Sequence, residues 1–214
     1  MATLAQLVDR VEEVIQRTYN GSVEAKINEG LDICASEVLL PALESEGTVT
    51  TNSTGIVDIP EDWSYDRGLY MCTFGEGSIV KVVDSVSLLE KEHPGFRTEL
   101  KAGDVKTCTV RAGQLIYYPI PAEATILTCG FYEKHTELSG LTDVPDILPK
   151  HLHYKLLCSF AAKEIFDIIE DGIDGAKVNT AIYSNKFKAA LDELKEYHQI
   201  GKSVKPATRT KSWI

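Results

Sequence analysis

Hydrophobic residues follow a helical spacing at both ends of the chain. Near the N-terminus they recur every three to four positions, which predicts an amphipathic helix whose start has the T-x-x-Q form of a capping box at Thr3 and Gln6. The pattern breaks at 20–22 (NGS), and a second helical stripe follows until Pro41 and Gly47 end it. Because the break is so short, we expect the two helices to be antiparallel neighbours. The apolar positions of the two stripes are Leu4, Leu7, Val8, Val11, Val14 and Ile15, then Ile27, Leu31, Cys34, Val38 and Leu39.

After the second stripe the pattern changes to short β-branched or aromatic runs separated by Gly, Pro and Asn, which predicts strands. The segment FGEGS at 74–78 predicts a hairpin turn. The segment SLLEKEH predicts a short helix that Ser85 or Ser87 caps and Pro94–Gly95 closes. We therefore expect residues 47–133 to form a small antiparallel sheet that contains one short helix.

Helical spacing returns at Pro149 and runs to about Asp171, and a last helical stripe spans roughly 176–199. The sequence therefore predicts an α+β fold, mainly a bundle of four helices with a small antiparallel β-sheet inserted between helices two and three, plus an extended C-terminal tail. The expected parts are an N-terminal helix pair at 1–46, the β insertion at 47–133, a long connection at 134–148, a C-terminal helix pair at 149–200 and an extended C-terminal arm at 201–214.

The composition is that of an ordinary globular protein with an acidic balance. Of the 214 residues, 43% are hydrophobic and 25% are charged. No apolar run approaches the roughly 18–20 residues that a membrane span needs, and the N-terminus lacks the pattern of a secretory signal, so we expect a cytoplasmic protein without a membrane partner. The net charge of −10 argues against a protein that wraps nucleic acid, because Lys and Arg supply much of the affinity for phosphates. It leaves open a protein that DNA passes without binding.

Two histidines one residue apart, in the stretch PKHLHYKLLC, raise the question of a metal site. On a helix, residues i and i+2 point about 200° apart, so His151 and His153 cannot close on one ion as an i, i+4 pair would. Pro149 is favoured in the first turn of a helix, and Asp146 lies just upstream as a cap or dipole partner. We therefore interpret the stretch as a helix start and expect no metal.

The cysteines are odd in number, scattered and without a C-x-x-C pair, so we expect buried thiols rather than a disulfide framework or a zinc knuckle. They are Cys34, Cys72, Cys108, Cys129 and Cys158.

No catalytic signature of the G-x-S-x-G, Walker, G-x-G-x-x-G or H-E-x-x-H type is present. The carboxylate pairs Glu12–Glu13, Asp143/Asp146 and Glu170–Asp171 fit solvated surface better than acid–base chemistry, and His135 stands alone. We therefore expect no enzyme, no catalytic residues and no cofactor. A soluble enzyme whose site the sequence does not announce remains an alternative.

The C-terminal arm, KSVKPATRTKSWI, is basic and ends in two large apolar residues. Disorder is one interpretation. Docking onto a partner is the other, because a free arm gains nothing from exposing Trp and Ile, and such anchors are typical of interface hot spots. The docking residues would be Lys202, Lys205, Arg209, Lys211, Trp213 and Ile214.

Four stretches, taken in order, resemble the head-to-tail connector adaptor family of tailed bacteriophages. They are INEGLDICA, VDIPEDW, LIYYPIPAEATILTCGFYEKHTELSG and TDVPDILPKHLHYKLLCSFAAKEIF, within roughly 4–198. The last resembles the family's D-V-P-D-I-P start of helix three and is the most specific match. Gly30 departs from the family's usual Ala, the last helix lacks an obvious family motif, and the arm is not covered.

The resemblance implies a structural protein of the virion neck, synthesised in the cytoplasm of the bacterial host. Such adaptors form a ring of about a dozen copies below the portal, extend the DNA channel and provide the platform for tail attachment. The implied partners are the portal protein, downstream tail or nozzle proteins and further copies of the chain, while genomic DNA passes without sequence-specific binding. We expect the arm to reach the portal. Alternatives are another neck component, such as a tail-completion or nozzle protein, and a DNA-packaging accessory.

Overall fold

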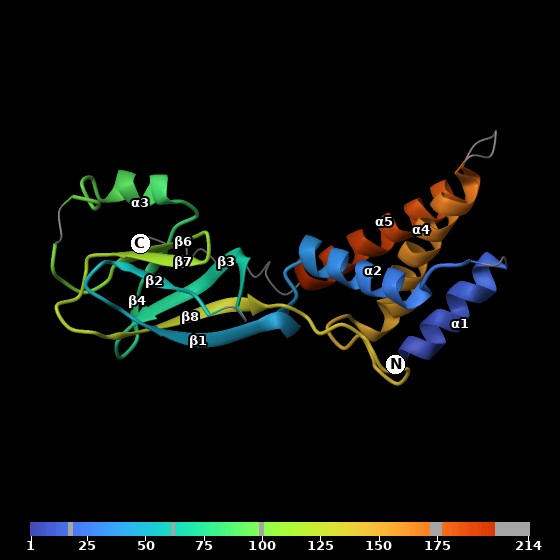
Figure 1. Cartoon of the computed structure of the whole chain (residues 1–214), viewed down its shortest axis with the longest axis horizontal. Coiled ribbons are helices and arrows are strands. Elements are labelled where there is room, and N and C mark those ends of the chain that lie inside the picture. The colour runs from blue at the N-terminus through green and yellow to red at the C-terminus, as the bar shows by residue number, and fades with distance from the viewer. Residues whose placement is uncertain (17–18, 61–62, 99–100, 172–176, 200–214) are drawn as a thin grey trace, which may run out of the picture. The chain divides into compact units, whose positions relative to one another are not determined.

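The chain folds into two compact units in the computed structural model, which describes residues 1–16, 19–60, 63–98, 101–171 and 177–199. The helical unit comprises Met1–Ala42 and His135–Ile214, and the β unit comprises Leu43–Lys134. Figure 1 shows the helices and strands of each unit.

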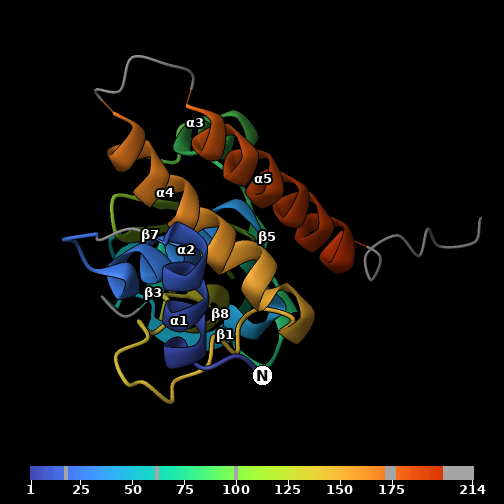
Figure 2. The same cartoon turned by 90° about the vertical axis from the view of Figure 1, so that its right-hand side faces the viewer.

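The helical unit is built from two N-terminal and two C-terminal α-helices, with two short non-α turns before the third of these. The elements are α1 (Leu4–Ile15), α2 (Val23–Glu37), the 3₁₀ turn η2 (Lys150–Leu152), the π-helical turn η3 (Tyr154–Cys158), α4 (Ser159–Glu170) and α5 (Val178–Gln199). Helices α4 and α5 lie side by side, as both Figure 1 and Figure 2 show.

Helix α1 begins as the sequence predicts. The Thr3 hydroxyl accepts a hydrogen bond from Gln6 N (3.4 Å), and Thr3 N donates to Gln6 Oε1 (3.1 Å), which confirms the capping box. The connection at 134–148, which follows the β unit, supplies two further acceptors. Leu4 N donates to Asp143 O (2.8 Å), and Ala5 N donates to Leu141 O (3.1 Å). The first turn of α1 is therefore tied to a loop about 140 positions away in sequence.

Close packing between α2 and α4 explains why a glycine stands in the middle of α2. A Cβ added at Gly30 would come within 2.9 Å of Phe160 Cδ1 and 3.2 Å of Phe160 Cβ. Gly30 is buried, and Phe160 contacts the edge of Phe187 on α5. The departure from Ala noted in the sequence therefore has a packing reason.

The prediction of one helix from Pro149 to about Asp171 is wrong at its start. The segment opens with the 3₁₀ turn, in which Leu152 N donates to Pro149 O (2.8 Å), continues through the π-helical turn and becomes α-helical only at Ser159. Leu152, Leu156 and Leu157 are nevertheless fully buried, so the whole segment contributes to the core.

The β unit contains two four-stranded sheets. Its elements are the 3₁₀ turn η1 (Pro41–Leu43), which begins just before the unit, β1 (Glu44–Thr50), β2 (Ile56–Asp58), β3 (Trp63–Phe74), β4 (Ser78–Ile79), β5 (Lys81–Val82), α3 (Val86–Glu92), β6 (Thr107–Arg111), β7 (Gln114–Tyr118) and β8 (Ile126–Glu133). One sheet has the order β1-β8-β3-β4 and the other β2-β7-β6-β5. Buried side chains from both sheets fill one core, which includes Val49, Leu115, Tyr117, Leu127 and Phe131.

Two local predictions in the β unit are confirmed. The FGEGS turn joins β3 to β4, which pair as Phe74↔Ser78, and Gly75 and Gly77 have positive φ values of 59° and 111°. Helix α3 is capped by Ser85, whose hydroxyl accepts from Leu88 N (3.3 Å), rather than by Ser87.

The predicted four-helix bundle with one small sheet is wrong. The described residues form an α+β mixture with five α-helices and two sheets of four strands each. One of the short β-branched runs that predict strands, SIVKVV at 78–83, divides into two strands at the buried Val80. Residues Ser78–Ile79 pair with β3, whereas Lys81–Val82 pair with β6, and that second pairing is parallel. A chain that passes from one sheet to the other over three residues leaves no mark in its own hydrophobic pattern.

Candidate functional site

An acidic cleft of about 390 Å³ lies along α2 in the helical unit. Its carboxylates come from one face of α2 and from the connection that follows the β unit. Of these, Glu29 pairs with Lys26 (2.7 Å). The lining residues are Ser22, Glu24, Ala25, Asn28, Glu29, Asp32, Glu137 and Leu138. The cleft therefore has the charge to receive a cationic group.

Asn28 holds the wall of this acidic cleft together. Its Nδ2 donates to Leu138 O (2.9 Å), and its Oδ1 accepts from Leu138 N (2.9 Å), so one side chain satisfies both backbone groups of Leu138. Asn28 belongs to the INEG stretch, which the sequence singles out only as a resemblance. In this fold, the stretch ties α2 to the connection through the pair Asn28–Leu138, which are 110 positions apart in sequence.

His135 is buried beside the acidic cleft, with 4% of its side chain exposed. Its Nε2 lies 3.5 Å from Asp32 Oδ1, and no hydrogen-bond partner for Nε2 is found among the described residues. His135, which stands apart from the other histidines in the sequence, is thus a buried residue at the start of the connection.

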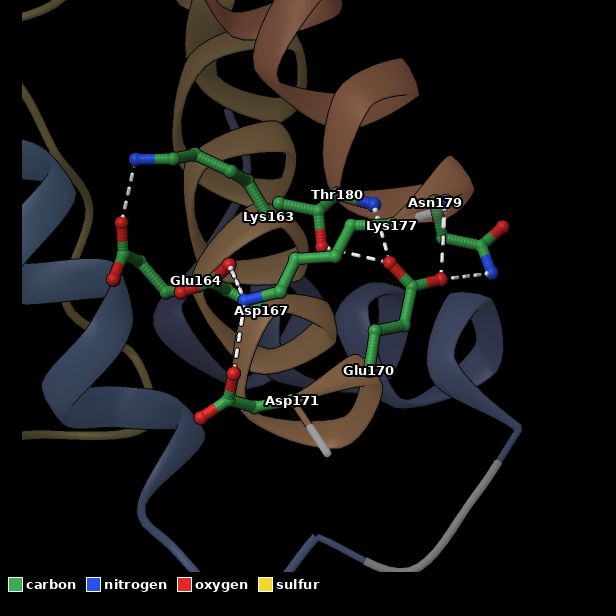
Figure 3. Close-up of polar contacts among 8 residues, drawn as sticks. All are labelled: Lys163, Glu164, Asp167, Glu170, Asp171, Lys177, Asn179 and Thr180. Atoms are coloured by element: carbon green, nitrogen blue, oxygen red, sulfur yellow. Dashed lines mark hydrogen bonds and ion pairs between the residues drawn. The ribbon is translucent and has the colours of Figure 1, made fainter. Parts of the chain in front are cut away.

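A polar network fixes the corner between α4 and α5 (Figure 3). The Glu170 carboxylate accepts four hydrogen bonds: from Asn179 N (3.1 Å) and Nδ2 (2.8 Å), and from Thr180 N (3.1 Å) and Oγ1 (2.8 Å). Figure 3 also shows Lys177 between two carboxylates, with its Nζ 2.8 Å from Asp167 Oδ1 and 3.2 Å from Asp171 Oδ1. Glu170 therefore serves as an external cap for the first amides of α5.

These contacts shift the pKa values of Glu170 and Lys177. Although burial raises the pKa of Glu170, the hydrogen bonds from Thr180 and Asn179 outweigh it and lower that pKa to about 2. The bonds to Asp167 and Asp171 raise the pKa of Lys177. Glu170 lies at the surface, as the sequence suggests, but the sequence interpretation missed its role as a cap of α5. A glutamate at the end of one helix, nine residues before an Asn-Thr pair that starts the next, was the available signal.

A second cleft, of about 750 Å³, lies where α1 leads into α2. Polar and apolar side chains line it, among them Glu12, Ile15, Tyr19 and Glu24. Neither this opening nor the acidic cleft brings together a nucleophile, a base and an oxyanion donor in the part of the chain that the structure describes.

The two histidines of the PKHLHYKLLC stretch have separate surroundings. His153 is fully buried, and its Nε2 donates to Leu148 O (3.1 Å), while burial lowers its pKa. His151 is half-exposed, with Nε2 3.7 Å from Glu193 Oε1. Among the described residues, no group of three or more His, Cys, Asp or Glu has an arrangement that could hold a metal ion.

The remaining predicted site residues are placed as follows. All five cysteines are free and buried, which confirms the prediction of buried thiols. Asp143 caps its own loop by accepting from Ser139 N (2.9 Å) and Gly140 N (2.7 Å), and these bonds lower its pKa. The proposed docking residues lie outside the described residues; they are Lys202, Lys205, Arg209, Lys211, Trp213 and Ile214.

Apolar side chains are exposed at the end of the α4–α5 hairpin that holds the Glu170 network. Ile168 is 54% exposed, Val178 56% and Ile182 44%, and each lies within three residues of a member of that network. In the last helix, α5, the buried side chains among those described are Ala190 and Leu194, so most of its side chains are exposed or only partly buried.

Within the described residues, no helix combines the length and the apolar character needed to cross a membrane. A scan against protein-family models finds no matching family, and a search of curated proteins finds no similar sequence.

Proposed function

We propose that this chain is a structural protein of the neck of a tailed bacteriophage virion, namely a head-to-tail connector adaptor rather than an enzyme. In this role it forms a ring of about a dozen copies below the portal, extends the DNA channel and provides the platform for tail attachment. Its partners are further copies of itself, the portal protein and downstream tail or nozzle proteins. The proposal rests on the ordered succession of stretches that resembles the adaptor family.

One structural observation carries the proposal beyond resemblance: the long, mostly exposed helix α5. A helix of 22 residues with so little buried surface is stabilised only along one side within its own unit. Apolar residues that remain exposed on α4 and α5 are the kind of surface that a neighbouring copy buries. Assembly into a ring gives such a helix its second packing partner.

The acidic balance is compatible with a channel for DNA. Each chain carries a net charge of −10, so a closed ring is strongly acidic. Phosphates are repelled by carboxylates, so a channel wall lined with carboxylates lets the duplex slide.

The experiment that tests the proposal measures the mass and shape of the assembly. Light scattering and negative-stain imaging are performed on the full chain alone and mixed with the portal protein of the same phage. We expect a ring, either free or formed on the portal. A monomer that ignores the portal would contradict the adaptor role, and binding to another adaptor instead would favour a tail-completion or nozzle protein.

A gel-retardation assay at low salt distinguishes the adaptor from the alternative of a DNA-packaging accessory. An adaptor of this charge is expected to leave a linear duplex unshifted. A shift that weakens with added salt would instead favour a DNA-packaging accessory.

A further inference from the structure

Three buried thiols meet in the core of the β unit. Cys72 comes from β3, Cys129 from β8 and Cys108 from β6, and each is at most 1% exposed. The sulfur atoms of Cys72 and Cys129 are 3.8 Å apart. The scattered spacing of these cysteines in the sequence gives no sign of this cluster.

Cys72 and Cys129 are direct partners in the antiparallel ladder between β3 and β8. In such a ladder, hydrogen-bonded pairs alternate with non-hydrogen-bonded pairs. Gly75 N donates to Ile126 O (3.0 Å), so the hydrogen-bonded position lies three steps from the cysteine pair. The two cysteines therefore occupy a non-hydrogen-bonded pair.

The hydrogen bonds between β8 and its other neighbour, β1, agree with this assignment of the cysteines to a non-hydrogen-bonded pair. Thr51 N donates to Thr125 O (2.8 Å), so the odd-numbered residues of β8 direct their backbone groups toward β1. Cys129 thus bonds to β1 through its backbone and faces Cys72 without backbone bonds between them. Cα atoms in such a pair are about 4.5 Å apart, which lies within the range of about 4.4–6.8 Å that a disulfide spans.

We propose that Cys72 and Cys129 are a dithiol pair that oxidises to a cross-strand disulfide joining β3 to β8, with a peroxide as the oxidant. The proposal does not rest on the proposed function, since it concerns only the interior of the β unit.

The neighbouring thiols determine which sulfur reacts first. Hydrogen bonds from Cys108 and Cys129 lower the pKa of Cys72, although burial opposes this shift, and the same contacts raise the pKa of the other two thiols. The Cys72 sulfur attacks one peroxide oxygen, the O–O bond breaks, and a sulfenic acid and one water result. The Cys129 sulfur then attacks the Cys72 sulfur, the S–O bond breaks, and a second water leaves. The two thiol hydrogens end in the two waters.

Access to the pair requires local opening of the ladder. The register of β3 against β8 shifts between Ser64 and Leu69 and again between Leu69 and Met71, immediately before Cys72. Such irregular pairing opens more readily than a continuous ladder, so we expect slow oxidation by a small reagent. Once formed, the bond links positions 57 apart and restricts the unfolded chain, so the melting temperature of the β unit should rise by about 10 °C.

The test treats the native full chain with hydrogen peroxide, unfolds it, and alkylates the remaining thiols before intact-mass and peptide analysis. We expect the loss of two hydrogens, a linked peptide pair containing Cys72 and Cys129, and alkylation of the other cysteines. A thiol reductant should restore alkylation of both. The proposal is overturned if all five cysteines remain alkylatable, or if Cys108 is the linked partner.

Matched variants separate the pair from its neighbour. Cys108→Ala should retain the link, whereas Cys72→Ala and Cys129→Ala should each abolish it and the peroxide-dependent rise in melting temperature. Retention of a link in either of the latter two variants overturns the assignment. The mapping of the wild-type chain stands even if a variant fails to fold.

Discussion

At the scale of single residues, Gly30 determines how closely α2 approaches α4. Ala at this position would gain about 1 kcal/mol of helix propensity but would overpack against Phe160, at a cost of about 1–3 kcal/mol. The Cβ and Cγ atoms of Phe160 both lie 3.2 Å from the added methyl position, so rotation of the ring alone does not relieve the contact. We therefore expect Gly30→Ala to lower the free energy of unfolding by about 1 kcal/mol in urea titrations.

A double-mutant cycle checks the cause of this loss. If the clash with Phe160 is responsible, Gly30→Ala and Phe160→Leu together should cost less than the sum of the two single changes. Strictly additive costs would show that another contact limits the site.

Glu170 should make the stability of the helical unit depend on pH in acid. Its pKa falls from an ordinary value of 4.5 to about 2 in the folded chain, so its contribution is complete above pH 4.5 and is lost as the pH falls toward 2. We expect Glu170→Gln to be less stable than the wild type near neutral pH, with a difference that shrinks across that interval. Urea unfolding at several pH values measures it.

The matched control for this effect is Glu76→Gln, at an exposed turn position. It should leave the acid dependence of the wild type unchanged. A constant difference between Glu170→Gln and wild type at all pH values would contradict the role of the carboxylate charge.

At the scale of elements, Asn28 ties the connection after the β unit to α2. Asn28→Asp keeps the acceptor for Leu138 N but replaces the donor to Leu138 O with a second acceptor. We expect a loss of about 1–3 kcal/mol and faster proteolytic cleavage within 134–148, because the connection then lacks its anchor. Asn185→Asp, the same change at an exposed position of α5, should change neither quantity. Equal cleavage rates in both variants would show that other contacts hold the connection.

At the scale of the whole molecule, the exposed apolar residues of the α4–α5 hairpin are the surface on which the proposed ring depends. Ile182→Asp places a charge on that surface, so we expect loss of the ring in light scattering with little change in melting temperature. Ile79→Asp, at an 88% exposed position of the β unit, is the control that should still assemble. Assembly of both variants would exclude this hairpin as the contact between copies.

The C-terminal arm belongs to the same scale, because it is expected to join this chain to the portal. A chain that ends at Gly201 should lose binding to the portal and keep its circular dichroism spectrum. Trp213→Ala in the full chain should weaken binding while leaving the basic residues in place. Portal binding by the shortened chain at wild-type strength would remove the arm from the interface.

Local signals in the sequence were sufficient for elements whose bonds lie within a few residues. The capping box of α1, the glycine turn after β3 and the Ser85 cap of α3 each involve partners three or four positions apart, so a pattern along the chain contains all of their parts. The bonds of Asn28 were missed because their partner, Leu138, lies 110 positions away, a distance that no periodicity encodes. Those of Glu170 cross only nine or ten positions, but they join two helices, and helical periodicity within either one does not show them.

The sequence by itself determined where most helices and strands form, that the cysteines are buried, and that the chain mixes helix with sheet, because propensity, capping and burial act on neighbouring residues. Only the tertiary structure decided that the strands divide into two sheets, that SIVKVV passes from one to the other, and that Cys72 faces Cys129. Strand pairing is a choice among distant partners, made by the packing of whole faces. A strand with the same alternation can satisfy that packing in either sheet.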